Sequence, residues 1–316
     1  MGFLPDLENF MDIEYQEVIM TAIREPGAVN DTTYLIDAIH EGISGGYAVY
    51  LLKSKTGGTC LIDAGTKDSA PVIYNKLKEL SAWPIDRLII THSHWDHTQG
   101  IEFLREKASE TGSTIEIMAS EKALPFLADQ SFNTCFGTDQ EPYLNITDVI
   151  SLKDGDLLDV GRDLSLQILA TPGHMEDHIS ILDLCSGNIF VGDAIGMKWF
   201  DNFTVPNPNS PYWNEEDFLK TIDRLKKTNY KSLSLAHFGC LADDQARQFP
   251  DESLSTYRQW MEFFAENNER LDDISFLADL MWKRVYTLVP ADLKPLLRPG
   301  LEGAVELAAR TWKGEY

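Results

Sequence analysis

The stretch THSHWDHTQG, residues 91–100, places three histidines and an aspartate within six positions of a chain that has only seven histidines. It follows the apolar run 86–91, which is typical of a buried strand. His92 and His94 alternate, and alternate side chains of an extended segment point the same way, so both imidazoles can reach one cation. Asp96 and His97 stand where the chain is expected to turn into a helix, within reach of a second cation. Imidazole and carboxylate suit Zn²⁺, and also Fe or Mn, so the spacing favours a metal site over a solvated polar loop.

Three more candidate ligands stand at the C-terminal ends of expected strands: His174, Asp193 and His237. Open α/β sheets place their sites at these ends, so we expect the three side chains to join the first cluster. Six of the seven histidines, His178 included, fall in these segments. Only His40 lies elsewhere, and it is expected on the surface.

The rest of the chain predicts strands and helices in alternation. Apolar runs rich in strand formers predict strands at 47–52, 59–63, 86–91, 114–120, 164–171, 178–184, 188–193 and, last, 232–237. Helical spacing predicts helices at 71–83, 98–109, 121–129 and 214–227, the last with Asn214 as its cap and Phe218, Leu219, Ile222 and Leu225 on one face. This order indicates an α/β sandwich.

The pattern changes to helix alone after residue 248. Pro290, Pro295 and Pro299 are expected to interrupt it before a final helix near 301–312. We therefore expect a main domain over 1–248 and a helical appendage over 249–316.

Five short segments carry a resemblance to a known family. They are LIDAG (61–65), THSHWDH (91–97), ATPGH (170–174), VGDA (191–194) and AHFG (236–239). In this order they resemble the motifs of the metallo-β-lactamase-fold hydrolases, which implies an αββα sandwich with two metal ions. The resemblance implies these ligands: His92, His94 and His174 for the first metal, Asp96, His97 and His237 for the second, and Asp193 as a bridge.

Two further residues are expected beside the ligands. The resemblance implies that Asp63 steadies the ligand loop, and the alternative is an aspartate in a turn at the end of a strand. His178 lies four residues after His174. The resemblance implies a buried structural residue there, which we prefer to a ligand because buried imidazoles mostly find hydrogen-bond partners.

Individual residues distinguish branches of the family. The antibiotic-degrading lactamases are secreted and lack the bridging aspartate, whereas residues 1–18 have no basic start or long apolar run and Asp193 is present. The flavodiiron branch has a glutamate where His94 stands. The segments GHMEDHISI (173–181) and GDAIG (192–196), with the helical C-terminus, are more similar to glyoxalase II and the bacterial quinolone-signal thioesterase.

The leading prediction is a dinuclear metal-dependent hydrolase that uses a metal-bridging hydroxide. Two cations about 3.5–4 Å apart lower the pKa of a shared water to about 7. Asp96 is the expected catalytic proton carrier. Zn is the first expectation and Fe or Mn the alternatives. The expected substrate is a small ester, thioester, lactone or phosphodiester. A mononuclear iron persulfide dioxygenase and a non-catalytic ligand-binding regulator stay open.

Aromatic residues follow Asp193 in the stretch 197–213. We expect them to form a wall of the substrate site, because a loop of this length after a ligand is usually functional. They are Trp199, Phe200, Phe203, Tyr212 and Trp213. The alternative is that they pack the C-terminal helices onto the sandwich.

Composition limits the partners. A formal net charge of −23 repels phosphate backbones, so nucleic acid is not expected and a small-molecule substrate is. No apolar stretch has the length of a membrane helix. Four cysteines without CxxC spacing fit a reducing cytoplasm.

The predicted C-terminal helices have apolar faces that are expected to be buried. Tyr257, Trp260, Met261 and Phe264 share one helical face and would otherwise expose a large apolar patch. We expect these helices to form a partial cap over the metal site. The alternative is a homodimer through the same faces.

Overall fold

The structure is a computed structural model that describes residues 23, 25–39, 42, 44–137, 142–200, 203–208, 211–285, 287 and 294–314. The N-terminal stretch 1–18 and His40, for which the sequence predicted no secretory signal and a surface position, lie outside the described residues. The side chains of Trp199 and Phe200 also lie outside them.

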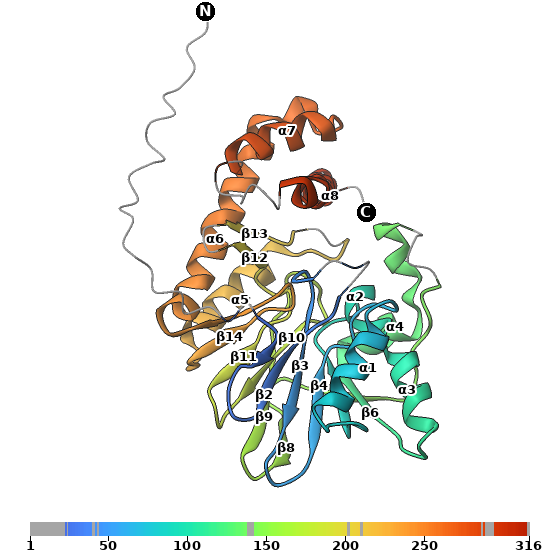
Figure 1. Ribbon diagram of the computed structural model, residues 1–316. Helices are drawn as coiled ribbons and strands as arrows, with labels where there is room; N and C mark the ends of the chain where they lie inside the picture. Colours follow the sequence, from blue (N-terminus) through green and yellow to red (C-terminus); the bar gives the residue numbers. More distant parts are fainter. Residues whose placement is uncertain are drawn as a thin grey trace, which may run out of the picture.

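Two sheets face each other in the described part of the chain (Figure 1). The larger contains, in spatial order, β1 (Gly27–Ala28), β2 (Thr33–Asp37), β3 (Ala48–Lys53), β4 (Thr59–Ile62), β5 (Arg87–Ile90), β6 (Glu116–Ser120) and β7 (Val149–Leu152). The smaller contains, in spatial order, β15 (Cys240–Ala242), β14 (Ser232–Ser234), β11 (Asn188–Phe190), β10 (Ile179–Asp183), β9 (Leu164–Ala170) and β8 (Leu157–Gly161). Strands β3 and β4 correspond to the expected strands 47–52 and 59–63, and they pair antiparallel as a hairpin.

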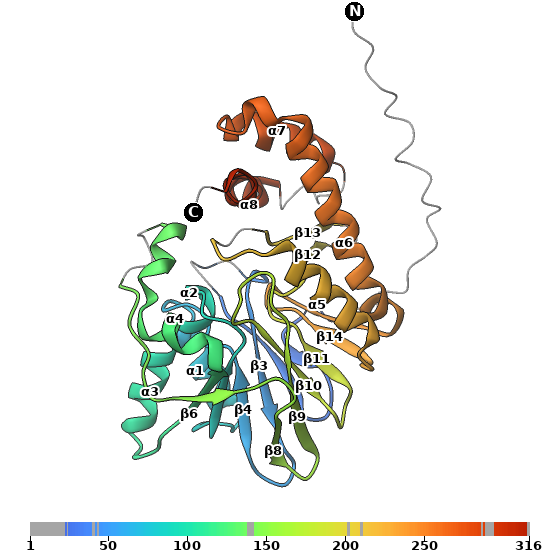
Figure 2. The ribbon, with the colours of Figure 1, turned by 180° about the vertical axis from the view of Figure 1, so that it is seen from behind.

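Helices cover the outer face of each sheet (Figures 1 and 2). Against the larger sheet lie α1 (Ala70–Glu79) and α3 (Ile101–Ser109), and against the smaller lie α5 (Glu215–Lys227) and the first part of α6 (Asp243–Glu266). The remaining helices are α2 (Trp95–Thr98), η2 (Glu121–Ala123), α4 (Leu124–Ala128), η3 (Gln130–Phe136), η4 (Asn268–Arg270), α7 (Ile274–Val285) and α8 (Lys294–Lys313). The fold is the αββα sandwich with a C-terminal helical region that the sequence predicted.

Strand β3 shows why the layers stack. Val49 and Leu51 pack under the helices α1 and α3, whereas Tyr50 and Leu52 point into the space between the sheets. Alternate side chains of a strand point to opposite faces, so a strand that is apolar at every position is buried on both sides.

Helix α5 begins and ends where the sequence predicted. The side chain of Asn214 accepts a hydrogen bond from the backbone N–H of Asp217 at 3.0 Å and caps the helix. Phe218, Ile222 and Leu225 are buried against the smaller sheet. Leu219, which was expected on the same face, is 38% exposed.

The C-terminal helices bury their apolar stripes within the chain. Trp260 and Phe264 of α6 pack with Phe203 and Val205 of the hairpin β12 (Met197–Phe200) and β13 (Phe203–Val205), together with residues of α7 and α8. Tyr257 packs with α5 instead. The expectation that these faces are buried is therefore correct.

Three expectations about the second half of the chain need correction. The stretch 197–213 is not one loop, because it contains the hairpin β12–β13. Strand β14 is not the last, because the chain turns back after it and forms β15. Helix α8 begins at Lys294 and contains Pro299, which removes one backbone N–H but does not stop the helix.

The boundary expected at 248 falls inside α6, so the division into domains stays a prediction.

No helix in the described residues is long and apolar enough to cross a membrane.

Candidate metal centre

The centre begins where β5 ends. Asp63, one residue past β4, has a positive φ of 61°, and its carboxylate accepts hydrogen bonds from the backbone N–H and the hydroxyl of Thr91. The same carboxylate lies 2.8 Å from Nδ1 of His97. These contacts fix the path of the chain from β5 into α2, and so fix the side chains between them.

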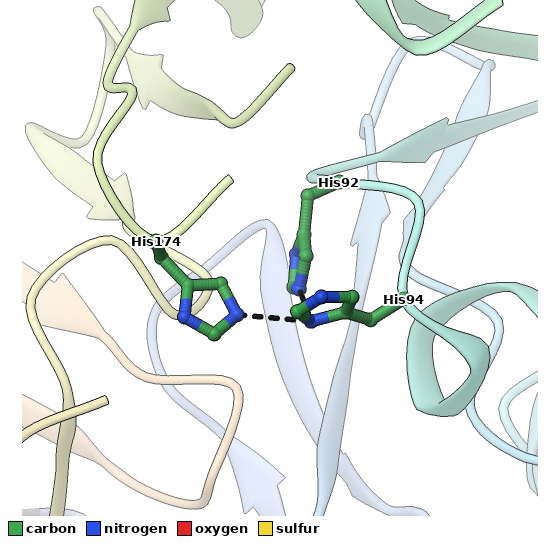
Figure 3. Close-up of side chains that lie close together, drawn as sticks. All are labelled: His92, His94 and His174. Carbon is green, nitrogen blue, oxygen red and sulfur yellow. Dashed lines mark hydrogen bonds between the residues drawn. The ribbon is translucent and has the colours of Figure 1, made fainter. Parts of the chain in front are cut away.

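Three imidazoles converge on one point. His94 Nδ1 lies 3.0 Å from His92 Nε2 and 2.9 Å from His174 Nε2 (Figure 3). All three side chains are buried. His92 and His94 come from the segment after β5 and His174 from the segment after β9, so the two sheets bring them together.

A second group lies beside the first. His237 Nε2 and His97 Nε2 lie 3.6 Å and 3.7 Å from Oδ2 of Asp96. Asp96 and His237 keep 12% and 13% of their side chains exposed, which makes this group the more accessible of the two. The donor atoms of all three residues are close enough together to hold one cation.

Asp193 lies between the groups. Its Oδ2 is 3.1 Å from His237 Nε2 and 3.7 Å from His174 Nε2, while its Oδ1 is 3.7 Å from His97 Nε2. Each group therefore has a histidine within 4 Å of this carboxylate. The position fits the bridging role that the resemblance implies.

The surroundings set the charge of the donors. Burial, reinforced by the neighbouring imidazoles, holds the pKa of His92 and of His94 well below the usual histidine value. Burial also opposes protonation of His97, but carboxylates led by that of Asp96 outweigh it and raise its pKa to about 10. Neutral imidazoles have a free lone pair, and the raised pKa of His97 marks a place where the surrounding carboxylates stabilise positive charge.

A further observation indicates that these donors are suited to metal ions. Nε2 of His97 and Oδ1 of Asp193 are buried and have no hydrogen-bond partner in the described part of the chain. Buried polar atoms are almost always paired, so unpaired donors that converge indicate a ligand. A set of nitrogen and carboxylate donors is suited to Zn²⁺, Fe or Mn.

Comparison with known proteins places the chain in a family. The family model described as the metallo-beta-lactamase superfamily matches residues 44–237, more than half of the chain. The chain belongs to this superfamily.

Two curated proteins illustrate what the chain is similar to in sequence. A Bacillus subtilis (strain 168) protein, YobT, is 28% identical over 196 residues, which cover 60% of this chain and 81% of YobT. A hydroxyacylglutathione hydrolase of Saccharophagus degradans is 30% identical over 160 residues, 48% of each chain. The chain thus spans about half the length of the hydroxyacylglutathione hydrolases it matches.

Solved structures agree on the fold. The crystal structure of a metallo-beta-lactamase family protein from Thermus thermophilus matches with a TM-score of 0.62 at 21% identity, over 90% of this chain and 94% of that one. An archaeal superfamily protein from Sulfolobus tokodaii matches with a TM-score of 0.56 at 20% identity, over 71% and 85% of the two chains.

His178 lies behind the candidate metal donors of this superfamily member. It is buried, its ring stacks on His92 with centroids 5.0 Å apart, and its Nδ1 lies 3.0 Å from the hydroxyl of Thr171. Its Nε2 accepts the backbone N–H of Asp193 at 3.1 Å. Both ring nitrogens are thus used within the protein, as expected of a structural residue.

Two polar residues near the centre were missed from the sequence. The amide of Asn207 donates to Oδ2 of Asp193 at 3.2 Å, and its backbone carbonyl lies 3.0 Å from Nδ1 of His174. The carboxylate of Asp177 accepts the backbone N–H of Ser93 at 3.0 Å. Nothing local marks Asn207, because its contacts are made with residues at distant positions. Asp177 lies inside the quoted segment 173–181 and could have been singled out there.

The aromatic residues expected to form a wall divide into two sets. Phe203 is buried among the C-terminal helices, and Trp213 packs on Phe218 and Tyr257, so both take the packing role that was the alternative. Tyr212 is 39% exposed and contacts the rings of Phe126 and Phe132.

The rings beside the metal donors come from α4 and η3. Phe136 and Phe132 lie with their ring centroids 4.8 Å and 6.1 Å from that of His94. Phe126 and Tyr212 extend this group, with centroids 5.4 Å and 5.8 Å from that of Phe132. An aromatic surface therefore adjoins the first donor group, and α8 reaches it through a hydrogen bond from Arg310 to the carbonyl of Cys135.

Proposed function

We propose that the protein is a dinuclear metal-dependent hydrolase of small carboxylic esters or thioesters. The observation that carries the proposal is the pair of donor groups with the Asp193 carboxylate between them. Two divalent cations held there would supply Lewis acidity, which activates water and polarises a carbonyl oxygen. Zn is the first candidate, and Fe or Mn are the alternatives.

The chain's own residues supply the rest of the chemistry. Asp96 is partly exposed and belongs to the more accessible donor group, so it is the carboxylate that can accept a proton from water and pass it to the leaving group. The buried imidazoles hold the donor geometry. Asp63 keeps the ring of His97 in one orientation by accepting a hydrogen bond from its Nδ1.

The aromatic rings beside His94 favour a substrate with an uncharged, apolar acyl group. Phe132 and Phe136 offer no hydrogen-bond donor to a phosphodiester, and the net charge of −23 repels anions. The curated relatives named hydroxyacylglutathione hydrolase carry the name of a thioester substrate, which supports the same class. Cytoplasmic location, suggested by the cysteines, is part of this proposal.

A screen of the metal-loaded protein tests the proposal. Aryl and alkyl thioesters and esters should be hydrolysed, and phosphodiesters should not. Activity should disappear after chelation and return with Zn²⁺, Fe²⁺ or Mn²⁺. A mononuclear iron persulfide dioxygenase would instead contain one iron per chain and consume oxygen with a persulfide, so that result would overturn the proposal.

A further inference from the structure

Asn207 touches two candidate metal ligands at once. Its side-chain amide donates to Oδ2 of Asp193, and its backbone carbonyl faces Nδ1 of His174 at 3.0 Å. The residue is 3% exposed, and its own Oδ1 has no hydrogen-bond partner among the described residues. It lies two residues after the end of β13 and stands between Pro206 and Pro208, which restrict its backbone.

The hairpin that carries Asn207 is fastened to α6. Nζ of Lys198 in β12 lies 2.6 Å and 2.7 Å from the two carboxylate oxygens of Glu252, and the hydroxyl of Thr204 in β13 donates to the same carboxylate. The hydroxyl of Ser253 donates to the carbonyl of Ile195 at 2.5 Å. Lys198 is only 6% exposed, whereas the side chain of Glu252 is 36% exposed, so water screens this ion pair only in part.

We propose that Asn207 is a positioning residue for both donor groups, and that α6 sets its place through Glu252. The proposal rests on the metal centre of the proposed function. It assigns a role in metal binding to a helix that lies outside the five motifs.

The chemistry of each contact gives the reason. A carbonyl that accepts from Nδ1–H fixes the tautomer of His174 in which Nε2 has the free lone pair, and Nε2 is the atom that faces His94. The amide of Asn207 holds one oxygen of Asp193 and so limits rotation of the carboxylate between the two groups. Because one residue makes both contacts, a displacement of the hairpin would disturb both donor groups.

Substitution of Asn207 tests the contact of its side-chain amide with Asp193, because the backbone carbonyl that faces His174 stays in every variant. Asn207→Ala should bind Zn²⁺ about 10–100-fold more weakly, which is the usual effect of losing a partner of a metal ligand, and should release metal faster to a chelator. Asn207→Leu, which keeps the volume without the amide, should behave in the same way if the alanine variant does not fold.

Asn188→Ala is the matched control. Asn188 is also buried, but its amide bonds Ser234 in the smaller sheet rather than a candidate ligand. This variant should lower the melting temperature of the metal-free protein and leave the metal affinity unchanged. If the Asn207 variants also lose only melting temperature and keep the parent affinity and release rate, the positioning role is wrong.

Substitution of Glu252 tests whether α6 sets the position of Asn207. Glu252→Gln keeps the shape and weakens the pair with Lys198, so metal release should accelerate several-fold. Glu266→Gln is the control. Glu266 lies at the exposed end of the same helix and pairs with Arg284 at 3.5 Å, so its substitution should leave the rate of metal release unchanged. Equal release rates in the two variants would contradict the link through α6. A parent protein that binds two metals but hydrolyses nothing in the screen would refute the proposed function and leave this test intact.

Discussion

Asp63 joins the backbone and the metal centre through a single side chain. It accepts hydrogen bonds from the backbone N–H and the hydroxyl of Thr91 and from Nδ1 of His97, and it has a left-handed backbone conformation. Few side chains other than Asn and Asp adopt this conformation at low cost. The residue is therefore fitted to its place both by its backbone and by its charge.

Replacing Asp63 should weaken metal binding without opening the fold. Asp63→Asn keeps the backbone preference but loses one acceptor, so His97 is held less firmly and metal affinity should fall about 10–100-fold. Equilibrium dialysis against Zn²⁺ measures this. Asp86→Asn is the control, because Asp86 also ties two segments by accepting from Thr59 but lies on the surface away from the donors. Equal affinities in the two variants would contradict the role of Asp63.

Asp177 predicts a pH dependence of stability. Burial raises its pKa to about 7, above the usual value of 3.8, so between these values the folded protein holds a proton that the unfolded chain releases. This stability is complete below about pH 4 and is lost as pH rises through about 7. Asp177→Asn has no such proton. From pH 5 to pH 8, the free energy of unfolding of the metal-free parent should therefore fall by about 2–4 kcal/mol relative to that of Asp177→Asn, and urea unfolding measures this difference. Parallel pH profiles would contradict this.

At the scale of elements, α4 and η3 form the aromatic side of the site and α5 and α6 form its support. Phe132 adjoins His94, whereas Trp213 packs on Phe218 and Tyr257. We therefore expect a substitution of Phe132 to affect substrate binding and a substitution of Trp213 to affect stability.

Alanine variants of these two residues separate binding from packing. Phe132→Ala should raise the KM for an aryl thioester several-fold with little change in melting temperature, because the ring is only partly buried. Trp213→Ala should lower the melting temperature by several degrees, since a loss of 1 kcal/mol in a domain of this size costs about 2–4 °C. If Trp213→Ala changes KM alone, the original expectation of a wall at that position is right after all.

The elements that could be predicted are those whose pattern is local. The ligand motifs, the β3–β4 hairpin and the cap of α5 each lie in one short segment, so spacing and composition reveal them. The hairpin β12–β13 was missed because its strands are short and their aromatic residues suggested a loop. Asn207 could not be predicted, because its partners His174 and Asp193 reach it only through the fold.

In the whole molecule, the C-terminal helices pack against the sandwich and the hairpin β12–β13. Phe249 and Tyr257 of α6 are buried with α5 and the smaller sheet, and α7 and α8 close over the hairpin (Figure 2). A chain that ends at residue 248 would expose these clusters and lose Glu252. It should therefore lose metal and aggregate, and is not a clean test of a cap.

The association state tests the remaining choice between cap and dimer. Trp260 and Phe264 are buried within one chain, so no large apolar face of α6 is left for a partner. Sedimentation of the full chain should give a monomer. A dimer that persists at micromolar concentration would favour the interface, and the capping role would then be wrong.

The metal content of the purified protein is the most direct test of the whole account. Elemental analysis of the chain should find close to two equivalents of Zn, Fe or Mn, because two donor groups share the carboxylate of Asp193. Asp193→Ala should lower both equivalents together, since that side chain adjoins both groups. One equivalent or less in an active parent protein, or full metal content in Asp193→Ala, would contradict the two-metal centre.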